Sequence, residues 1–251
     1  MRGVILAGGT GSRLHPLTMV TSKHLLPVGR IPMIYWTLAR IMEGGVKDIL
    51  IVTSKEHMDD IIGLLGSGYD LGINLTYKVQ DMAGGIAQAL GLAEDFVGNR
   101  KCIVMLGDNI FAQSLSENIR FFSDENSGAS VILKKVSDPQ RFGVAELSQD
   151  GSKIISIEEK PDNPKSNLIV TGCYMYDFGV FDVIKTLKPS GRGELEITDV
   201  NNYYVKKDLM QWTEYHGEWT DAGTFSSLLK ANQIAYNIPV PEIISSVMER
   251  K

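Results

Sequence analysis

The chain of 251 residues is expected to fold as an α/β protein with a doubly wound, mostly parallel central sheet flanked by helices. Three observations predict this class. Short apolar runs alternate with helix-like segments through the first half. Runs such as 102–106 (CIVML) are apolar on both faces, as central parallel strands are. A glycine-rich turn follows the first run, where open α/β sheets bind ligands.

Strands and helices are expected to alternate up to about residue 136. The first helix is expected to close at Gly44-Gly45, because glycine commonly ends a helix. The predicted strands cover 2–7, 48–53, 74–79, 101–106 and 129–136, and the predicted helices cover 32–45, 56–68, 86–96 and 114–124.

The pattern changes after Ser137, where strand-like segments follow one another without long helices between them. No linker, repeat or low-complexity stretch separates the two parts. We therefore expect one domain, residues 1–251, with a first half of about 1–136 and a mixed, β-rich second half of about 137–251. The second half has predicted strands at 143–148, 153–159, 168–177 and 210–217, and predicted helices at 178–187, 196–207 and 226–237, the last taken as terminal.

Composition excludes several classes of protein. A net charge of -5 argues against a general nucleic-acid or membrane surface, so no such partner is expected, and any phosphate site must be local. The two cysteines, Cys102 and Cys173, lie in apolar runs and are expected to be buried thiols, not a zinc site or a disulfide framework. No run reaches the ~18 apolar residues of a membrane span and no signal segment is visible, which predicts a cytoplasmic protein.

The stretch from Leu6 to Val28 carries the strongest functional signal. Its glycines free the backbone to turn tightly and to approach a ligand closely. Arg13 and Lys23 lie on either side of the Pro16 turn. Exposed backbone N–H groups together with two cations are typical of a polyphosphate-binding site. The candidate phosphate-binding positions in this loop are Leu6, Gly8, Gly9, Gly11, Ser12, Arg13 and Lys23.

Two better-known phosphate loops do not match. A Walker loop needs a lysine directly after its last glycine, and none follows Gly11. A dinucleotide fingerprint needs a third glycine where Leu14 stands, and an acid near the end of the second strand, which closes on Thr53-Ser54. An NAD-dependent enzyme is therefore excluded, while a glycine-rich turn without a ligand stays as the plain alternative.

Two aspartates are candidates for a metal site. Asp108 directly follows the predicted strand 101–106, at the same edge of the sheet as the glycine loop. Asp221 lies in a glycine- and threonine-flanked segment, 218–225. Converging carboxylates beside phosphates suit Mg²⁺, a hard ion with oxygen ligands. Taken alone, Asp108 is equally consistent with a turn residue or a helix cap, and an aspartate such as Asp221 is more often a turn residue.

Two further polar groups stand at strand ends. Glu158, Glu159 and Lys160 end a strand before Pro161, and are either simply solvated or bind a sugar and its phosphate. Gln80 follows another strand and precedes a glycine pair. Its side-chain amide has one donor and one acceptor edge, which suits thymine or uracil. With the amide flipped, the same side chain suits cytosine. The residue therefore limits the choice of base without deciding it.

These motifs together resemble the sugar-phosphate nucleotidyltransferases, in particular the short bacterial glucose-1-phosphate thymidylyltransferases. The resemblance covers nearly the whole chain and is specific as a set. The motifs that carry it, in order, are GGTGSRLHPLT, SKHLLPV, VQDMAGGIAQA, LGDN, RFGVAE, EEKP, VTGCYMYD, GELEITDVN and WTDAGT.

The resemblance implies a reaction of dTTP with glucose 1-phosphate to give dTDP-glucose and pyrophosphate, a Mg²⁺ cofactor and a homo-oligomer, with a tetramer suggested. It implies a nucleotide-binding first half and a sugar-phosphate-binding second half. The implied catalytic residues are Arg13, Lys23 and Asp108. The implied nucleotide ligands are the loop residues above with Gln80, Gly85 and Asp108; the sugar-phosphate ligands are Asn109, Gly143, Glu158, Glu159, Lys160 and Val170; and the metal ligands are Asp108 and Asp221.

The chain departs from longer relatives at a few positions. Phe142 stands where many have tyrosine, His24 where they often have glutamine, and Gly29-Arg30 where they have a Tyr-Asp pair. A uridylyl-, cytidylyl- or guanylyltransferase of the same fold, and a non-catalytic sugar-nucleotide-binding protein, remain as alternatives. The second is disfavoured because every expected cation and acid is present.

Overall fold

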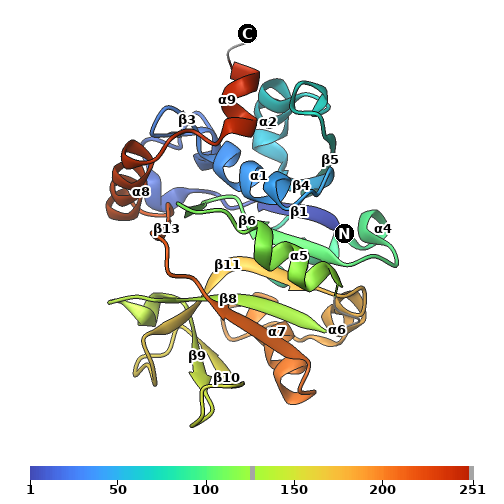
Figure 1. Ribbon diagram of the computed structural model, residues 1–251. Helices are drawn as coiled ribbons and strands as arrows, with labels where there is room; N and C mark the ends of the chain where they lie inside the picture. The colour runs from blue at the N-terminus through green and yellow to red at the C-terminus, as the bar shows by residue number, and fades with distance from the viewer. Residues whose placement is uncertain (125–127, 249–251) are drawn as a thin grey trace.

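A nine-stranded mixed sheet forms the centre of the computed structural model, which describes residues 1–124 and 128–248 (Figure 1). The strand order is β5-β4-β1-β6-β11-β8-β12, with β9 and β10 added beside β11. The main strands are β1 (Arg2–Ala7), β4 (Asp48–Ser54), β5 (Asn74–Gln80), β6 (Cys102–Leu106), β8 (Ala129–Lys135), β9 (Gly143–Leu147), β10 (Ile154–Glu159), β11 (Leu168–Tyr176) and β12 (Met210–Glu214). Two small ribbons pair β2 (Pro27–Val28) with β3 (Ile31–Pro32) and β7 (Asn109–Phe111) with β13 (Trp219–Asp221).

Helices cover both faces of this sheet. One face carries α1 (Met33–Glu43), α2 (Met58–Leu65), α5 (Ser116–Asp124), α8 (Phe225–Asn237) and α9 (Glu242–Met248), and the other carries α3 (Ile86–Gly91), α4 (Glu94–Val97), α6 (Val180–Thr186) and α7 (Ile197–Lys206). None of the helices in residues 1–124 and 128–248 is long and apolar enough to cross a membrane.

Apolar side chains on both faces explain why the central strands are buried. Along β1, Ile5 and Ala7 join the core under α1, whereas Val4 and Leu6 join the core under α3. Side chains alternate between faces along a strand, so a run without polar residues suits a sheet covered on both sides. The four strands β1, β4, β5 and β6 are parallel, as expected, and β11 turns the sheet antiparallel beside β6.

The structure differs from the sequence-based prediction at three places. The expected helix 86–96 is divided into α3 and α4, which we attribute to Gly91, a weak helix former at the break. The β7–β13 ribbon was not predicted, because three residues are too few to show an alternating pattern. Helix α8 agrees with the predicted 226–237 but is not terminal, since α9 follows and buries Ile244 on the same face as α1.

The arrangement brings distant segments to one edge of the sheet. β1, β5 and β6 are parallel, so their carboxyl ends open on the same side, the left of Figure 1. The chain then returns from the second half, and β13 pairs with β7 so that Asp221 lies opposite Asn109. The residues that follow β1, β5 and β6 can therefore meet. β10 ends at Glu159, which pairs with Gly143 of β9, the strand beside β11.

Candidate active site

The glycine loop after β1 folds back toward the end of β6. Gly11 has φ +65°, in the left-handed region, and its carbonyl accepts a hydrogen bond from Thr18 Oγ1 at 2.7 Å. At Gly8 the absence of a Cβ makes room for the amide oxygen of Gln80, which lies where a side chain would stand. The loop thereby carries Lys23 to the carboxyl end of β6.

Lys23 pairs with Asp108 at that point. Its Nζ lies 2.5 Å from Asp108 Oδ2, and both side chains are mostly buried. Burial opposes ionisation of Asp108, but the charge and the hydrogen bond of Lys23 outweigh it and hold the pKa of this carboxyl well below its usual range. The neighbouring His24 is fully buried, and burial together with the charge of Lys23 lowers its pKa to about 3. His24 is therefore neutral near pH 7.

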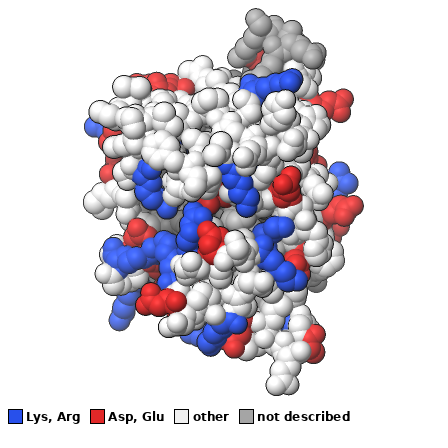
Figure 2. Space-filling model, turned by 90° about the vertical axis from the view of Figure 1, so that its left-hand side faces the viewer, with Lys and Arg blue, Asp and Glu red and all other residues white. Residues whose placement is uncertain are grey.

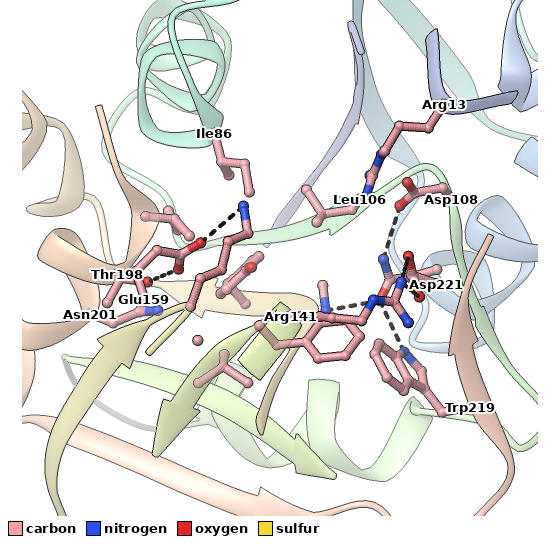
Figure 3. Close-up of a pocket in the computed structure, with 18 residues that line it drawn as sticks. Arg13, Ile86, Leu106, Asp108, Arg141, Glu159, Thr198, Asn201, Trp219 and Asp221 are labelled. Atoms are coloured by element: carbon pink, nitrogen blue, oxygen red, sulfur yellow. Dashed lines mark hydrogen bonds and ion pairs between the residues drawn. The ribbon is translucent and has the colours of Figure 1, made fainter. Parts of the chain in front are cut away.

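Asp221 reaches the same point from the other half of the chain. The N–H of Ala222 donates to the carbonyl of Asp108 at 2.8 Å, which fixes the two segments side by side. A Cβ on Gly223 would lie 3.1 Å from Asp221 Oδ2, 3.6 Å from Asp108 Oδ2 and 3.0 Å from Arg13 Nη2. The three charged groups thus converge on one small space, and Figure 3 shows Arg13 and Asp108 facing each other above Asp221.

Arg141 is the cation that accompanies Asp221. Its Nη2 lies 3.1 Å from Asp221 Oδ2, its Nη1 lies 2.9 Å from Asp138 Oδ2, and its guanidinium covers the ring of Phe142 at 5.0 Å. Burial and the nearby Asp108 raise the pKa of Asp221, while Arg141 and Arg13 counteract them. Each candidate metal ligand therefore has its own cationic partner.

A second group of polar side chains surrounds Glu159 at the end of β10. Its Oε2 accepts a hydrogen bond from Thr198 Oγ1 at 2.6 Å, and its Oε1 lies 3.3 Å from Arg192 Nη2 and 3.5 Å from Lys160 Nζ. Lys160 has φ +46°, a conformation that is uncommon for a residue with a side chain and that clusters at functional sites. The carboxylate and two cations suit a polar, anionic ligand.

Two adjoining cavities contain these groups. The glycine-loop cavity and the Glu159 cavity share a wall made by Arg13, Ile86, Leu106 and Asp108. The glycine-loop cavity is also lined by Leu6, Gly8, Gly9, Lys23, His24, Gln80, Ala83, Gly85, Ala89 and Glu194. The Glu159 cavity, drawn in Figure 3, is also lined by Asn109, Arg141, Phe142, Gly143, Glu159, Lys160, Val170, Gly172, Tyr174, Ile197, Thr198, Asn201, Trp219 and Asp221.

Most of the residues singled out in the sequence line one of these cavities, and three do not. Gly11 shapes the loop from outside them, and Ser12 is exposed. Glu158 is also exposed, because adjacent residues of β10 point to opposite faces and Glu159 takes the inner one. Asn109 lines the Glu159 cavity, but its amide is already engaged by Asp108, Gly172 and Trp219.

The sequence-based reasoning did not assign Arg141, Arg192, Thr198 or Trp219. Arg141, Thr198 and Trp219 fall inside motifs that were noticed (RFGVAE, GELEITDVN and WTDAGT), and Arg192 lies just before the second of these. Their charge and hydrogen-bonding capacity were the only features of the sequence that could have marked them as site residues.

Charge is distributed unevenly over the face that carries the site. Figure 2 shows lysine and arginine side chains gathered across the middle of this face, whereas its upper part is mostly uncharged. In a protein with net charge -5, such a band is a local anion-attracting field. This agrees with the expectation that a phosphate site in an acidic protein is confined to one part of its surface.

The residues also fit a hard divalent cation. Asp108 and Asp221 offer carboxylate oxygens, and Gly223 leaves the space between them open. No group of three or more histidine, cysteine, aspartate or glutamate residues within the described chain is placed to hold a metal. A two-carboxylate site suits Mg²⁺, which keeps several waters and takes phosphate oxygens as further ligands.

The fold and this paired anion site define a nucleotidyltransferase, and comparison with known proteins agrees. The model of the nucleotidyl transferase family matches residues 2–237, so the chain belongs to this family. The chain is 44% identical to the glucose-1-phosphate thymidylyltransferase of Neisseria meningitidis and 46% identical to that of Xanthomonas campestris, each over 92% of its length. It spans 81% and 79% of those relatives.

Solved structures give the same family and fold. A Bacillus anthracis protein assigned as a glucose-1-phosphate thymidylyltransferase, crystallised in complex with sucrose, is 55% identical, with a TM-score of 0.92 over 98% of this chain and 99% of that one. A UDP-glucose pyrophosphorylase complexed with UDP-glucose has a TM-score of 0.83 over 94% of this chain and 98% of that one, at 23% identity, which supports the fold alone. The expected doubly wound α/β class and the recognised family are confirmed.

Proposed function

We propose that this protein is a glucose-1-phosphate thymidylyltransferase, which transfers the thymidylyl group of dTTP to glucose 1-phosphate with the help of Mg²⁺. The observation that carries the proposal is the convergence of Asp108, Asp221 and Arg13 at the wall between two cavities. A reaction between two anionic substrates needs one site for each and cations where they meet. The names of the relatives support the choice of thymidine and glucose.

In the proposed reaction, an oxygen of the sugar phosphate forms a bond to the α-phosphorus of dTTP. The bond from that phosphorus to the bridging oxygen of the β-phosphate breaks, and pyrophosphate leaves with the electron pair. The nucleophile is already an anion near pH 7, so no general base is required. The protein must instead hold two mutually repelling groups in line and neutralise the charge that develops.

The charged residues of the two cavities have separate tasks in this mechanism. Arg13 and Lys23 face the triphosphate from the glycine loop, while Lys160 and Glu159 hold the sugar phosphate and the sugar in the other cavity. Asp108 and Asp221 would hold Mg²⁺, which would supply positive charge at the α-phosphate. The Nζ of Lys23 lies 2.5 Å from Asp108 Oδ2, so this lysine would stand beside the place where the α-phosphate binds.

The test is a panel of dTTP, UTP, dCTP and GTP, each crossed with several sugar 1-phosphates, with pyrophosphate release as the readout. The highest kcat/KM is expected for dTTP with glucose 1-phosphate. A higher value for another triphosphate would assign the protein to a different nucleotidyltransferase. Absence of pyrophosphate release with every pair would favour a binding protein without catalysis. The Lys23→Ala variant, purified in parallel, controls for contaminating activity.

A homo-oligomer, such as the tetramer that the resemblance suggests, and a cytoplasmic location both remain proposals. Both can be checked directly, by light scattering of the purified protein and by fractionation of cells that express it.

A further inference from the structure

Two glutamine side chains meet at the wall of the glycine-loop cavity. Gln80 ends β5 and is only 9% exposed, and Gln88 lies one turn into α3. The Nε2 of Gln80 donates to the Oε1 of Gln88 at 2.6 Å. Gln80 lines the cavity, whereas Gln88 stands behind it. Gln88 is therefore not a lining residue itself, but it contacts Gln80, which is.

The other end of the Gln80 amide is placed as well. Its Oε1 packs against Gly8, in the space that the missing Cβ leaves free. An oxygen in this place can accept a weak hydrogen bond from the Cα–H groups of glycine, which an NH₂ group cannot do. The two contacts act together, because Gln88 accepts a hydrogen bond from the nitrogen of the amide and Gly8 makes room for its oxygen.

The orientation of this amide matters because pyrimidines differ at the edge that it can read. Thymine and uracil present a ring N–H beside a carbonyl, and cytosine presents a ring nitrogen acceptor beside an amino group. A glutamine amide matches the first pattern in one orientation and the second pattern after a flip. Gln80 alone can read either kind of base, so its orientation must be fixed by a neighbour.

We propose that Gln88 is a specificity-determining residue, which fixes the amide of Gln80 so that the site selects a pyrimidine with a ring N–H over cytosine. This inference rests on the proposed function, since it assumes that the glycine-loop cavity holds the base of a nucleoside triphosphate. One Nε2 hydrogen of Gln80 is used by Gln88, and the second faces the base carbonyl. The oxygen of Gln80 accepts from the ring N–H.

A matched set of substitutions at Gln88 tests the proposal. Gln88→Glu leaves only acceptors and preserves the observed orientation of Gln80. Gln88→Lys leaves only donors, which pair with the oxygen of Gln80 and reverse the amide. Gln88→Met removes both kinds of group. Each variant is assayed for kcat/KM with dTTP and with dCTP, using glucose 1-phosphate and pyrophosphate release.

The readout is the ratio of the two kcat/KM values. We expect the Gln88→Glu ratio to equal or exceed that of the wild type, and the Gln88→Lys ratio to fall roughly 10- to 100-fold, the effect of one well-placed bidentate base contact. Gln88→Met should lie between them. Both triphosphates are assayed on the same protein, so a change in stability or in phosphate affinity cancels from the ratio.

Two results separate failure of this inference from failure of the proposed function. If the wild type prefers dTTP to dCTP and Gln80→Ala removes the preference, but Gln88→Lys and Gln88→Met retain it, Gln88 does not set specificity. If the wild type itself shows no preference for dTTP over dCTP, the proposed function is wrong.

Discussion

The two cavities share Arg13 and Asp108 but otherwise differ in their charged residues and in the elements that carry them. The glycine-loop cavity is built from loops that follow the parallel strands β1, β5 and β6, and its charge pair, Lys23 with Asp108, has side chains only 12% and 13% exposed. The Glu159 cavity is built from antiparallel strands and the start of α7, and in its pair Arg141 is 34% exposed. A buried pair interacts more strongly than a solvated one, so the Lys23–Asp108 pair is expected to be the stronger of the two.

The comparison also explains the division of work that we propose. The triphosphate carries more charge than the sugar phosphate, and it faces the more buried cation. The sugar side must distinguish hydroxyl groups, and it offers a carboxylate held by Thr198 and Arg192. Substitutions on the two sides should therefore differ in the size and the kind of their effects.

The largest effect is expected from Lys23→Ala. Turnover should fall roughly 10²–10³-fold, by analogy with the loss of one donor that stabilises a transition state. Turnover is measured by pyrophosphate release on protein that retains its circular dichroism spectrum. Lys153→Ala is the control, because Lys153 is an exposed lysine paired with Asp208 away from both cavities. A folded Lys23→Ala protein with near-normal turnover would remove Lys23 from the mechanism.

Asp108→Asn and Asp221→Asn test whether the two sides share one metal. Each removes one of two carboxylates, and the Mg²⁺ concentration for half-maximal activity should rise about 10-fold or more. Direct binding of Mn²⁺, followed by its electron paramagnetic resonance signal, provides a readout independent of turnover. Asp208→Asn serves as the control, since Asp208 is an exposed aspartate that pairs with Lys153 away from both cavities. An unchanged titration for either variant would exclude that aspartate from the site.

A smaller effect, on pH dependence, is expected from Arg141→Met. Burial and Asp108 raise the pKa of Asp221, and Arg141 opposes this rise. Without the guanidinium the pKa of Asp221 should rise further, so the carboxylate is lost sooner as pH falls. The acidic limb of the kcat/KM profile should therefore move to higher pH, while Arg141→Lys keeps the wild-type position. A profile that does not move would show that Arg141 does not control Asp221.

The smallest change is expected in stability, from His24→Gln. The pKa of His24 is lowered to about 3 in the folded protein, below its usual value of 6.5, so below pH 6.5 the unfolded chain binds a proton that the folded protein does not. Folding stability should thus decline as pH falls from 6.5 toward 3 because of this group.

Urea unfolding at several pH values between 7.5 and 4 measures this decline. Glutamine does not titrate and can accept and donate hydrogen bonds, so the His24→Gln protein should show a flatter acidic limb. Parallel curves for the two proteins would mean that other groups dominate acid unfolding.

The two sides of the site also differ in how far the sequence predicts them. The glycine-loop side was predictable because its residues directly follow apolar strands, and the carboxyl ends of parallel strands open on one edge. Lys23, Gln80 and Asp108 were found in this way. The other side depends on a long-range return of the chain. Whether Asp221 meets Asp108 is decided by the three-residue strands β7 and β13, which have no pattern long enough to detect.

Physical reasons also explain why sequence alone does not place several residues of the site. Glu158 and Glu159 are equivalent in composition, and only the register of β10 decides that one faces the cavity and the other faces solvent. Arg192 stands in an irregular segment before α7, where local propensity gives no direction to a side chain. Asn109 was taken as a sugar ligand, but its amide is engaged with Asp108, Gly172 and Trp219.

The short β7–β13 ribbon has a consequence for the inheritance of this architecture. Asp221 and the helices α8 and α9 pack against the first half of the chain, so we expect that residues 1–136 do not fold as a stable unit on their own. A fragment of that length would leave α1 uncovered where α9 packs and β2 uncovered where α8 packs. Gene fusions and fragment complementation should therefore keep the whole span from β1 through α9.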